Sequence, residues 1–373
     1  MKSLWWNSAL DKKKINKEIL RVIKTGRIDT ADCCRAYEKK LENYLNVKHV
    51  IAVSNGSMAN ILVFMALGLR QNDEIIIPNI GWISIINACK ILGLKAVLIE
   101  VDSKRPLLSI SEIQKNITKK TKVIFPVYMN GRVIEIDKIK KIAKKNKIFL
   151  VEDAAQAFGI KYKNSFLGTF GDAGIFSTSI TKNFTTGLGG FICTNNTKLA
   201  KIIFSMRRHG FSDIQNIKDW NNYGGNFKFS DIHAAIGICQ LKKYKRDLKL
   251  SLENFNLFKE LLKKSNKFIY PADISKKMGD RPVYNEFYSN NRNKIIKFLK
   301  SKNVETRLYS PAFDKVKYLK YKKTKKKYLN SEHFEKKVFY LPSGPGLKKN
   351  EIRRVARIIN TFYEKKPFIN NRF

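Results

Sequence analysis

The sequence has few of the residues that build disulfide frameworks or metal centres. Its 373 residues include five cysteines and four histidines. The cysteines are odd in number and none shows CxxC spacing, so they indicate neither a disulfide framework nor a zinc site. The histidines form no metal-ligating pattern. These absences favour a reduced, cytoplasmic protein without a metal. The five cysteines are Cys33, Cys34, Cys89, Cys193 and Cys239.

The sequence also lacks a long apolar run. No stretch of about 18 apolar residues is present, which is the length that a membrane-spanning helix needs. The first seven residues, MKSLWWN, contain no secretory apolar segment. Hydrophobic residues still make up 43% of the chain and aromatic residues 12%. The sequence therefore predicts a folded protein of two domains, or of one large domain with an appendage, and excludes a wholly disordered basic tail.

Acidic residues are scarce, with 31 against 73 basic ones and a net charge of +42. Such an excess is typical of proteins that bind nucleic acids or anionic membranes. The basic residues are nevertheless spread over many segments, which favours a general compositional bias over a binding footprint. One cluster, 315–327, is either a solvated loop or an anion-binding patch. Lysines and tyrosines alternate in and near it, which keeps a nucleic-acid groove as a remote alternative: Tyr318, Tyr321 and Tyr328.

Short apolar runs alternate with helical patterns in the first two thirds of the chain. This order predicts an α/β fold with a mainly parallel sheet flanked by helices, and a ligand site at the carboxyl ends of the strands. From about residue 250 the chain is Lys-rich and begins with an amphipathic stretch. We expect a large domain over 1–250, including the N-terminal segment, and a smaller α/β domain over 251–373. The expected strands are 50–53, 75–77, 96–99, 122–125 and 148–151, and the expected helices are 57–69, 83–92 and 136–144.

Two segments combine a strand end with polar or small residues. Residues 54–59 (SNGSMA) lie between a strand and a helix, where free backbone N–H groups and a hydroxyl can face an anion. An ordinary turn with a serine N-cap fits the same residues. Residues 151–156 (VEDAAQ) place two acids after an apolar strand. A carboxylate there either holds a positively charged ring nitrogen or caps a helix, and both interpretations stay open.

Two further segments lie later in the same region. Residues 171–177 (GDAGIFS) precede Lys182, which stands in a loop of small residues and threonines. Desolvation in such a loop favours the neutral amine, which is the nucleophile that forms a Schiff base. Without that context Lys182 is one more of many lysines. Residues 224–237 (GGNFKFSDIHAAIG) put small residues on a helix, which by itself indicates close helix packing.

Together and in this order, these segments resemble the pyridoxal-phosphate-dependent sugar aminotransferases of the DegT/StrS family, which have the fold-type I (aspartate aminotransferase) architecture. The resemblance covers about residues 28–363, and the spacings agree as well as the motifs. Weaker similarities occur at 304–311 and 341–344. The matching stretches are SNGSMA, EDAAQAFG, GDAGIFS, TKNFTTGLGG, RRHG and GGNFKFSDIHAAIG.

The resemblance implies pyridoxal 5'-phosphate (PLP) as cofactor and assigns roles around its ring. Lys182 forms the Schiff base with the cofactor and later moves the proton. Asp153 pairs with the pyridinium nitrogen and keeps the ring an electron sink. Gln156 lies near the phenolic oxygen of the ring. Trp82 stacks on the ring face.

The resemblance also implies how the cofactor phosphate is held. Gly56, Ser57 and the backbone of Met58 bind it, with help from Ser177. Asn226 reaches the phosphate in the partner subunit, so that the active site needs a homodimer. No metal is implied.

Several residues depart from the family pattern. Leu188 stands where the family usually has an acid, and Met58 replaces a small residue. Ile85 replaces a common threonine near the stacking aromatic, and Ser57 replaces the commoner threonine. These departures bear on substrate orientation more than on cofactor chemistry, because Lys182 and Asp153 are retained.

The implied function is the transfer of an amino group from L-glutamate to a keto group of a nucleotide-linked 6-deoxy-keto-hexose, for amino-sugar and surface polysaccharide biosynthesis. Some relatives carry histidine in place of the lysine and dehydrate the sugar instead, and Lys182 argues against that branch. A sugar dehydratase or an inactive relative remains the alternative within the fold. A basic nucleic-acid-binding protein is the alternative from another class.

Overall fold

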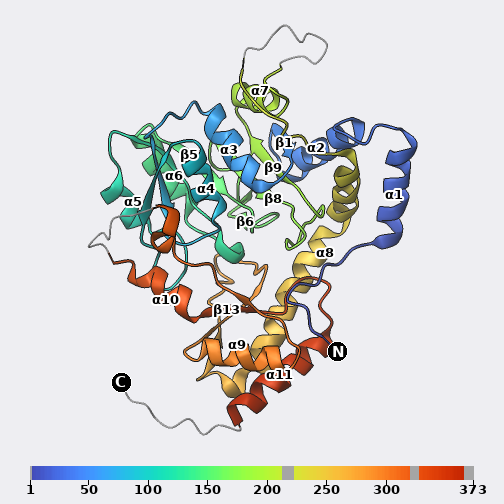
Figure 1. Ribbon diagram of the computed structural model, residues 1–373, viewed down its shortest axis with the longest axis vertical. Helices are drawn as coiled ribbons and strands as arrows, with labels where there is room; N and C mark the ends of the chain where they lie inside the picture. The colour runs from blue at the N-terminus through green and yellow to red at the C-terminus, as the bar shows by residue number, and fades with distance from the viewer. Residues whose placement is uncertain (1, 212–221, 320–326, 365–373) are drawn as a thin grey trace.

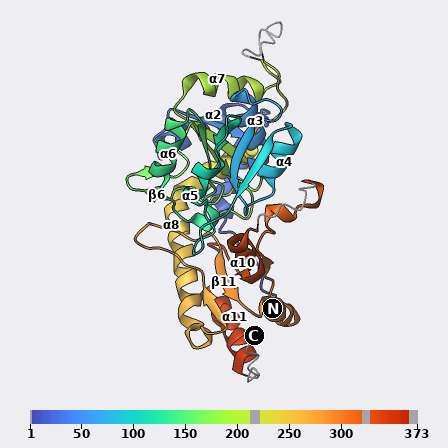
Figure 2. The same cartoon turned by 90° about the vertical axis from the view of Figure 1, so that its left-hand side faces the viewer.

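The computed structural model describes residues 2–211, 222–319 and 327–364. The chain forms a larger unit around one sheet and a smaller unit around a second sheet, stacked along the longest axis of the molecule (Figure 1). A long helix runs alongside both units in each of two perpendicular views (Figure 2). The expected α/β fold with a smaller C-terminal domain is confirmed.

The large sheet has seven strands in the order β1-β9-β8-β5-β4-β2-β3. The five strands from β8 to β3 are parallel, whereas β9 is antiparallel to both of its neighbours. The central strands are runs of Val, Ile and Leu, as expected where helices cover both faces of a sheet. The strands are β1 (His49–Val53), β2 (Glu74–Pro78), β3 (Lys95–Ile99), β4 (Thr121–Ile124), β5 (Phe149–Asp153), β8 (Ala173–Ser177) and β9 (Gly190–Thr194).

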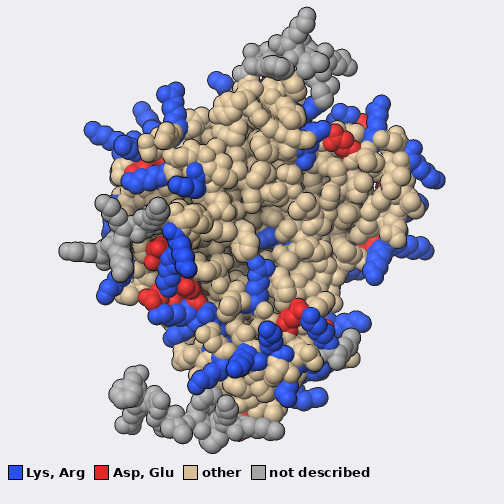
Figure 3. Space-filling view, in the orientation of Figure 1, with Lys and Arg blue, Asp and Glu red and all other residues tan. Residues whose placement is uncertain are grey.

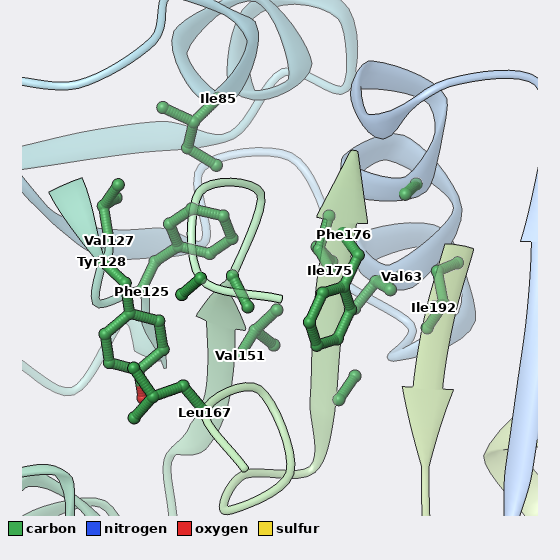
Figure 4. Close-up of a cluster of buried hydrophobic side chains, with 14 of the residues drawn as sticks. Val63, Ile85, Phe125, Val127, Tyr128, Val151, Leu167, Ile175, Phe176 and Ile192 are labelled. Atoms are coloured by element: carbon green, nitrogen blue, oxygen red, sulfur yellow. The ribbon is translucent and has the colours of Figure 1, made fainter. Parts of the chain in front are cut away.

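Helices pack on this sheet and enclose its core. Figure 4 shows part of that core, in which Val63 lies beside Ile175 and Phe176, and in which Ile85 is also placed. A short hairpin of β6 (Lys161–Tyr162) and β7 (Ser165–Phe166) lies outside the sheet. The helices of the large unit are α1 (Lys12–Lys24), α2 (Asp32–Leu45), α3 (Gly56–Ala66), α4 (Ser84–Ile91), α5 (Ile110–Asn116), α6 (Ile136–Lys145) and α7 (Thr197–Met206), with the 3-10 turn η1 (Met129–Gly131).

The small sheet is antiparallel, with the strand order β10-β11-β13-β12. Its apolar residues form a second core with those of the neighbouring helices, including Phe258, Phe287 and Val355. The strands are β10 (Ile269–Pro271), β11 (Asn285–Ser289), β12 (Arg307–Leu308) and β13 (Val338–Leu341). The helices are α9 (Arg292–Ser301), α10 (Leu329–Lys337) and α11 (Lys349–Glu364), with the 3-10 turns η2 (Lys263–Ser265), η3 (Phe313–Lys315) and η4 (Lys317–Leu319).

The long helix α8 (Asp231–Leu261) packs against α1 and α2 in the large unit and against α11 in the small one. At its start the Asp231 carboxylate accepts the backbone N–H groups of Ala31, Cys33 and Cys34 at 2.8–3.0 Å, and so caps α2 from outside. A Cβ added to Gly237 would lie 2.4 Å from the Tyr37 ring. The small residues of this segment therefore allow α8 to approach α2 closely.

The N-terminal residues lie on the small unit. Ser3 pairs with Val304, and Trp6 pairs with Ser343. Residue 250 lies inside α8, so the predicted domain boundary falls within a continuous helix. The division of the chain at that residue stays a prediction.

Charge is distributed broadly over the surface. Figure 3 shows Lys and Arg around the margins of both units on the face displayed. Of the cluster at 315–327, residues 320–326, and with them Tyr321, lie outside the described residues. The Tyr318 hydroxyl bonds to Asn87, and the Tyr328 hydroxyl donates to the Leu98 carbonyl at 3.1 Å. Within the described ranges, every helix is too short or too polar to cross a membrane.

Candidate active site

A cavity of about 460 Å³ lies at the carboxyl ends of the parallel strands and extends to the small unit. Ligands of open α/β sheets bind at this edge because the strand-to-helix loops converge there. Seven of the nine candidate site residues line the cavity: Gly56, Ser57, Trp82, Asp153, Gln156, Ser177 and Lys182. Met58 and Asn226 are not among the lining residues.

The N-terminus of α3 forms one end of the cavity. The Asn55 side chain caps this helix by accepting the Met58 N–H at 2.9 Å. The Gly56 and Ser57 amides stand at the start of the helix, where N–H groups have no intrahelical acceptor. A Cβ added to Gly56 would lie 3.2 Å from the Ser177 Cβ, so the glycine lets the helix start close to the end of β8. The geometry suits an anion, because free amides and the helix dipole point to one place.

The two acids at the end of β5 have opposite surroundings, because successive strand residues face opposite sides of a sheet. Glu152 is fully buried, and its carboxylate is saturated by donors from the protein. It holds the loop after β7 in place and does not face the cavity. Its donors are the Tyr128 hydroxyl and the backbone N–H groups of Gly168, Phe170 and Gly171.

Asp153 lines the cavity although only 8% of its surface is exposed. One of its carboxylate oxygens accepts the Ala155 N–H at 2.9 Å. Burial raises the pKa of Asp153, while that N–H group and the positive charge of Lys182 lower it. A buried carboxylate of this kind is stabilised by a further positive group in the cavity.

Lys182 lies in the loop between β8 and β9. Its Nζ atom is 3.5 Å from the Tyr284 hydroxyl, which itself donates to the Thr181 carbonyl at 3.2 Å. Across the base of the loop, the Thr178 and Thr186 hydroxyls are 2.7 Å apart and the Thr186 N–H donates to the Thr178 carbonyl at 2.8 Å. The amine is therefore presented to the cavity by a braced loop, and among the described residues it forms no ion pair.

Gln156 and Trp82 complete the lining predicted from the sequence. The Asn130 N–H donates to Gln156 Oε1 at 2.7 Å, which leaves the Gln156 amide NH₂ as a donor. Trp82 is 51% exposed in the loop after β2. The guanidinium carbon of Arg307 lies 5.2 Å from the centroid of the Trp82 ring.

The small unit supplies a wall that the sequence did not reveal. Tyr284 comes just before β11, whereas Arg307 and Tyr309 lie in and after β12. These residues are far from Lys182 in the sequence. The weaker family similarity at 304–311 was the one signal for Arg307 and Tyr309, and Tyr284 had none. The polar cavity residues outside the set predicted from the sequence include Asn55, Asn60, Ser84, Ser179, Thr181, Tyr284, Arg307, Tyr309 and Tyr340.

The residues that depart from the family pattern lie in different places. Leu188 lines the cavity and is 54% exposed. Ile85 is buried in the core of Figure 4, outside the cavity lining. Met58 is half-buried against the main core. Asn226 is exposed and pairs with Arg208 in an isolated bridge. Its expected role in a partner subunit stays a prediction.

Residues 9–360 match the sequence profile of the DegT/DnrJ/EryC1/StrS aminotransferase family. The chain belongs to this family. Because the match spans nearly the whole chain and the lysine and buried carboxylate share one cavity, the protein is an aminotransferase.

Individual relatives and solved structures are similar to the chain over most of its length. The chain is 30% identical over 340 residues to GDP-perosamine synthase from Escherichia coli O157:H7, covering 88% of this aminotransferase and 90% of the relative. It is 29% identical over 298 residues to GDP-4-keto-6-deoxy-D-mannose 3-dehydratase from Yersinia pseudotuberculosis, covering 74% of each. The crystal structure of NtdA from Bacillus subtilis with bound cofactor PMP superposes with a TM-score of 0.84 at 26% identity, covering 94% of this chain and 82% of NtdA.

Proposed function

We propose that the cavity binds PLP and that the enzyme transfers an amino group from L-glutamate to the keto group of a GDP-linked 6-deoxy-keto-hexose. One observation carries the proposal: Lys182, Asp153 and the N-terminus of α3 line the same cavity. The sugar nucleotide is inferred from the names of two relatives, both of which contain GDP. The product would serve amino-sugar and surface polysaccharide biosynthesis.

The lining residues fit PLP group by group. The phosphate suits the Gly56 and Ser57 amides with the Ser57 and Ser177 hydroxyls, since all of these face one end of the cavity. The second oxygen of Asp153 suits a protonated ring nitrogen. The Gln156 amide NH₂ suits the phenolic oxygen, and Trp82 offers a ring face for stacking. When bound, PLP supplies an electron sink for the carbon that loses its proton.

The protein's own groups then do the acid–base work. With the cofactor bound, Lys182 Nζ would accept the proton from the carbon that bears the donor's amino group and would deliver it to the cofactor carbon that takes up that amino group. The Tyr284 hydroxyl, at 3.5 Å, orients that amine. Asp153 stabilises a positive charge at the ring nitrogen. Burial disfavours the ionised carboxylate, and a neighbouring cation offsets that cost. The buried tyrosines of the small unit line the same cavity and add apolar surface to it.

We also propose that the enzyme is a homodimer in which Asn226 reaches the partner's phosphate site. The exposure of Asn226 and its absence from the cavity of its own chain support this assignment. The five cysteines are buried and free, which fits a reducing cytoplasm.

A sugar dehydratase remains the second candidate, because one relative carries that name. Transamination leaves the donor's nitrogen in the sugar product, whereas dehydration does not. Lys182 favours transamination, since a lysine amine both binds the cofactor covalently and returns the proton. A sugar product that has lost water and carries no nitrogen from glutamate would assign the chain to the dehydratases.

The absorption spectrum of the protein loaded with PLP, taken before and after addition of L-glutamate, tests the proposal. We expect a visible band that glutamate abolishes and that one keto sugar restores. GDP-linked, UDP-linked and dTDP-linked 4-keto-6-deoxyhexoses would then be compared as acceptors. A band that glutamate leaves unchanged would point to another donor, and no band at all would refute PLP binding.

A further inference from the structure

Arg307 of β12 occupies an unusual position on the cavity wall. Its guanidinium carbon lies 4.6 Å from the centroid of the Trp5 ring and 5.2 Å from that of Trp82. Two aromatic side chains from distant parts of the sequence thus hold one cation. Stacking on rings fixes the plane of a guanidinium while leaving its N–H groups at the edge available.

Three other arginines whose side chains are little exposed are paired with carboxylates: Arg105 with Asp280, Arg132 with Glu286 and Arg207 with Glu38. Arg307 takes part in no ion pair or side-chain hydrogen bond recorded among the described residues.

The acid nearest to it in the sequence, Glu305, is already engaged. Its carboxylate binds Lys2 Nζ at 2.6 Å and the Trp5 N–H at 3.2 Å. The N–H groups of Arg307 are therefore left for a group in the cavity.

Tyr309 offers a second unsatisfied donor beside it. Residues two apart on an extended segment face the same side, so Tyr309 follows Arg307 onto the cavity wall. Tyr309 is 3% exposed, and its hydroxyl has no hydrogen-bond partner in the described chain. A buried hydroxyl without a partner costs free energy, which a ligand atom would recover.

The N-terminal segment fixes the position of Trp5. The Ser343 N–H donates to the Trp5 carbonyl at 2.8 Å, and the Trp5 N–H donates to Glu305. The Trp5 ring packs against Trp6 and Tyr284, with centroids 6.0 and 6.1 Å away. Tyr284 in turn contacts Lys182, so a continuous series of contacts joins the Arg307 stack to the reactive amine.

We propose that Arg307 and Tyr309 bind an oxyanion of a substrate, and that Trp5 is the positioning residue that holds Arg307 for it. The anion is either the side-chain carboxylate of the amino donor or the diphosphate of the sugar nucleotide. Both present paired oxygens to which a guanidinium donates two parallel hydrogen bonds. The proposal rests on the proposed function, whose substrates carry these two groups.

Isothermal titration calorimetry of the PLP-loaded protein separates the two sources. Glutarate serves as an unreactive probe for the donor carboxylate, and GDP serves for the diphosphate. We expect Arg307→Gln to weaken one of the two probes about tenfold or more and to leave the other nearly unchanged. Arg353→Gln is the matched control, because Arg353 lies on the exposed face of α11. Equal affinities in Arg307→Gln and wild type, or no binding of either probe by wild type, would overturn the proposal.

Trp5→Leu tests the positioning role. It should raise KM for the substrate identified by calorimetry several-fold, with a smaller change in kcat. Arg307→Lys should bind the affected probe little better than Arg307→Gln, because lysine lacks the planar fork of a guanidinium. A kcat loss with unchanged KM would refute the role of Trp5. The visible PLP band and its response to glutamate report on the proposed function separately, so a failure of that function is distinguishable from a failure here.

Discussion

At the scale of single residues, the amine of Lys182 is the group on which the chemistry depends. We predict that Lys182→Ala loses the visible absorbance of bound PLP yet keeps its fold, because the side chain projects from a loop that threonines brace. Absorption and circular dichroism spectra would check both parts. Lys198→Ala, on the exposed start of α7, is the control. A visible band that persists in the Lys182 variant would mean that another lysine serves.

Substitution of Asp153 is expected to have opposite effects on stability and on activity. Burial raises its pKa, so ionisation of this carboxyl costs stability in the absence of a cation. Asp153→Asn should therefore leave the melting temperature of the cofactor-free protein equal or higher, and slow transamination by about a hundredfold or more. Thermal denaturation and turnover assays measure the two effects. Wild-type turnover in this variant would remove the role that we assign to the carboxylate.

At the scale of elements, Asp137 at the start of α6 ties that helix to the β6–β7 hairpin. Its carboxylate accepts from the Tyr162 hydroxyl at 2.9 Å and from Lys163 Nζ at 2.8 Å. The bond to Lys163 is the main cause that lowers the pKa of Asp137 to about 2. An acid whose pKa is lowered by folding stabilises the protein at any pH above the pKa that the acid has in the unfolded chain. This contribution is lost as the pH falls toward the lower pKa that the acid has in the folded protein.

Asp137→Asn should therefore lower the free energy of unfolding at pH 7 by less than about 1 kcal/mol, since the pair is largely exposed and screened by solvent. The difference from wild type should shrink as the pH falls below about 4. Urea unfolding at several pH values measures it. A difference that grows toward acid pH would show that the sign of the argument is wrong.

The elements of the large sheet follow from local sequence, and those of the small unit do not. Apolar runs such as 75–77 and 96–99 lie within β2 and β3, because buried parallel strands consist of continuous Val, Ile and Leu. Strands β10 and β12 have only three and two residues, which is too short for a periodic pattern. Their pairing depends on contacts between distant segments.

The site residues also differ in whether a local sequence pattern predicts them. Lys182 and Asp153 were predictable because each stands in a local motif. Arg307 lies on the short strand β12 and Tyr309 just after it. What makes them notable is that neither side chain forms a hydrogen bond or an ion pair with the described residues, which a sequence cannot display.

At the scale of the whole molecule, a buried ion pair joins the two units. Arg132, just after η1, and Glu286 of β11 are both fully buried, with Nη2 and Oε1 2.6 Å apart. The Asn130 side chain adds bonds from its NH₂ group to Glu286 at 2.9 Å and to the Tyr284 carbonyl at 3.1 Å. The junction thus aligns the turn that orients Gln156 with the strand that follows Tyr284.

Arg132→Met should cost about 3–5 kcal/mol of unfolding free energy, because it leaves the Glu286 charge buried without its partner. The double variant Arg132→Met, Glu286→Leu should recover much of that loss, since it removes the stranded charge. Denaturant unfolding of both variants gives the comparison. A double variant as unstable as the single one would indicate that packing, and not charge, dominates this junction.

The pairing of Ser3 with Val304 and of Trp6 with Ser343 has a consequence for protein engineering. The small unit is assembled from two pieces that lie at opposite ends of the described chain. An exchange of that unit between relatives, made to transplant sugar preference, could not use a single crossover near residue 250. It would need a second junction before α1, so that residues 3–7 travel with the strands that they contact. A single-crossover chimera would pair one protein's N-terminal segment with another's β12, and the wall around Arg307 would be mismatched.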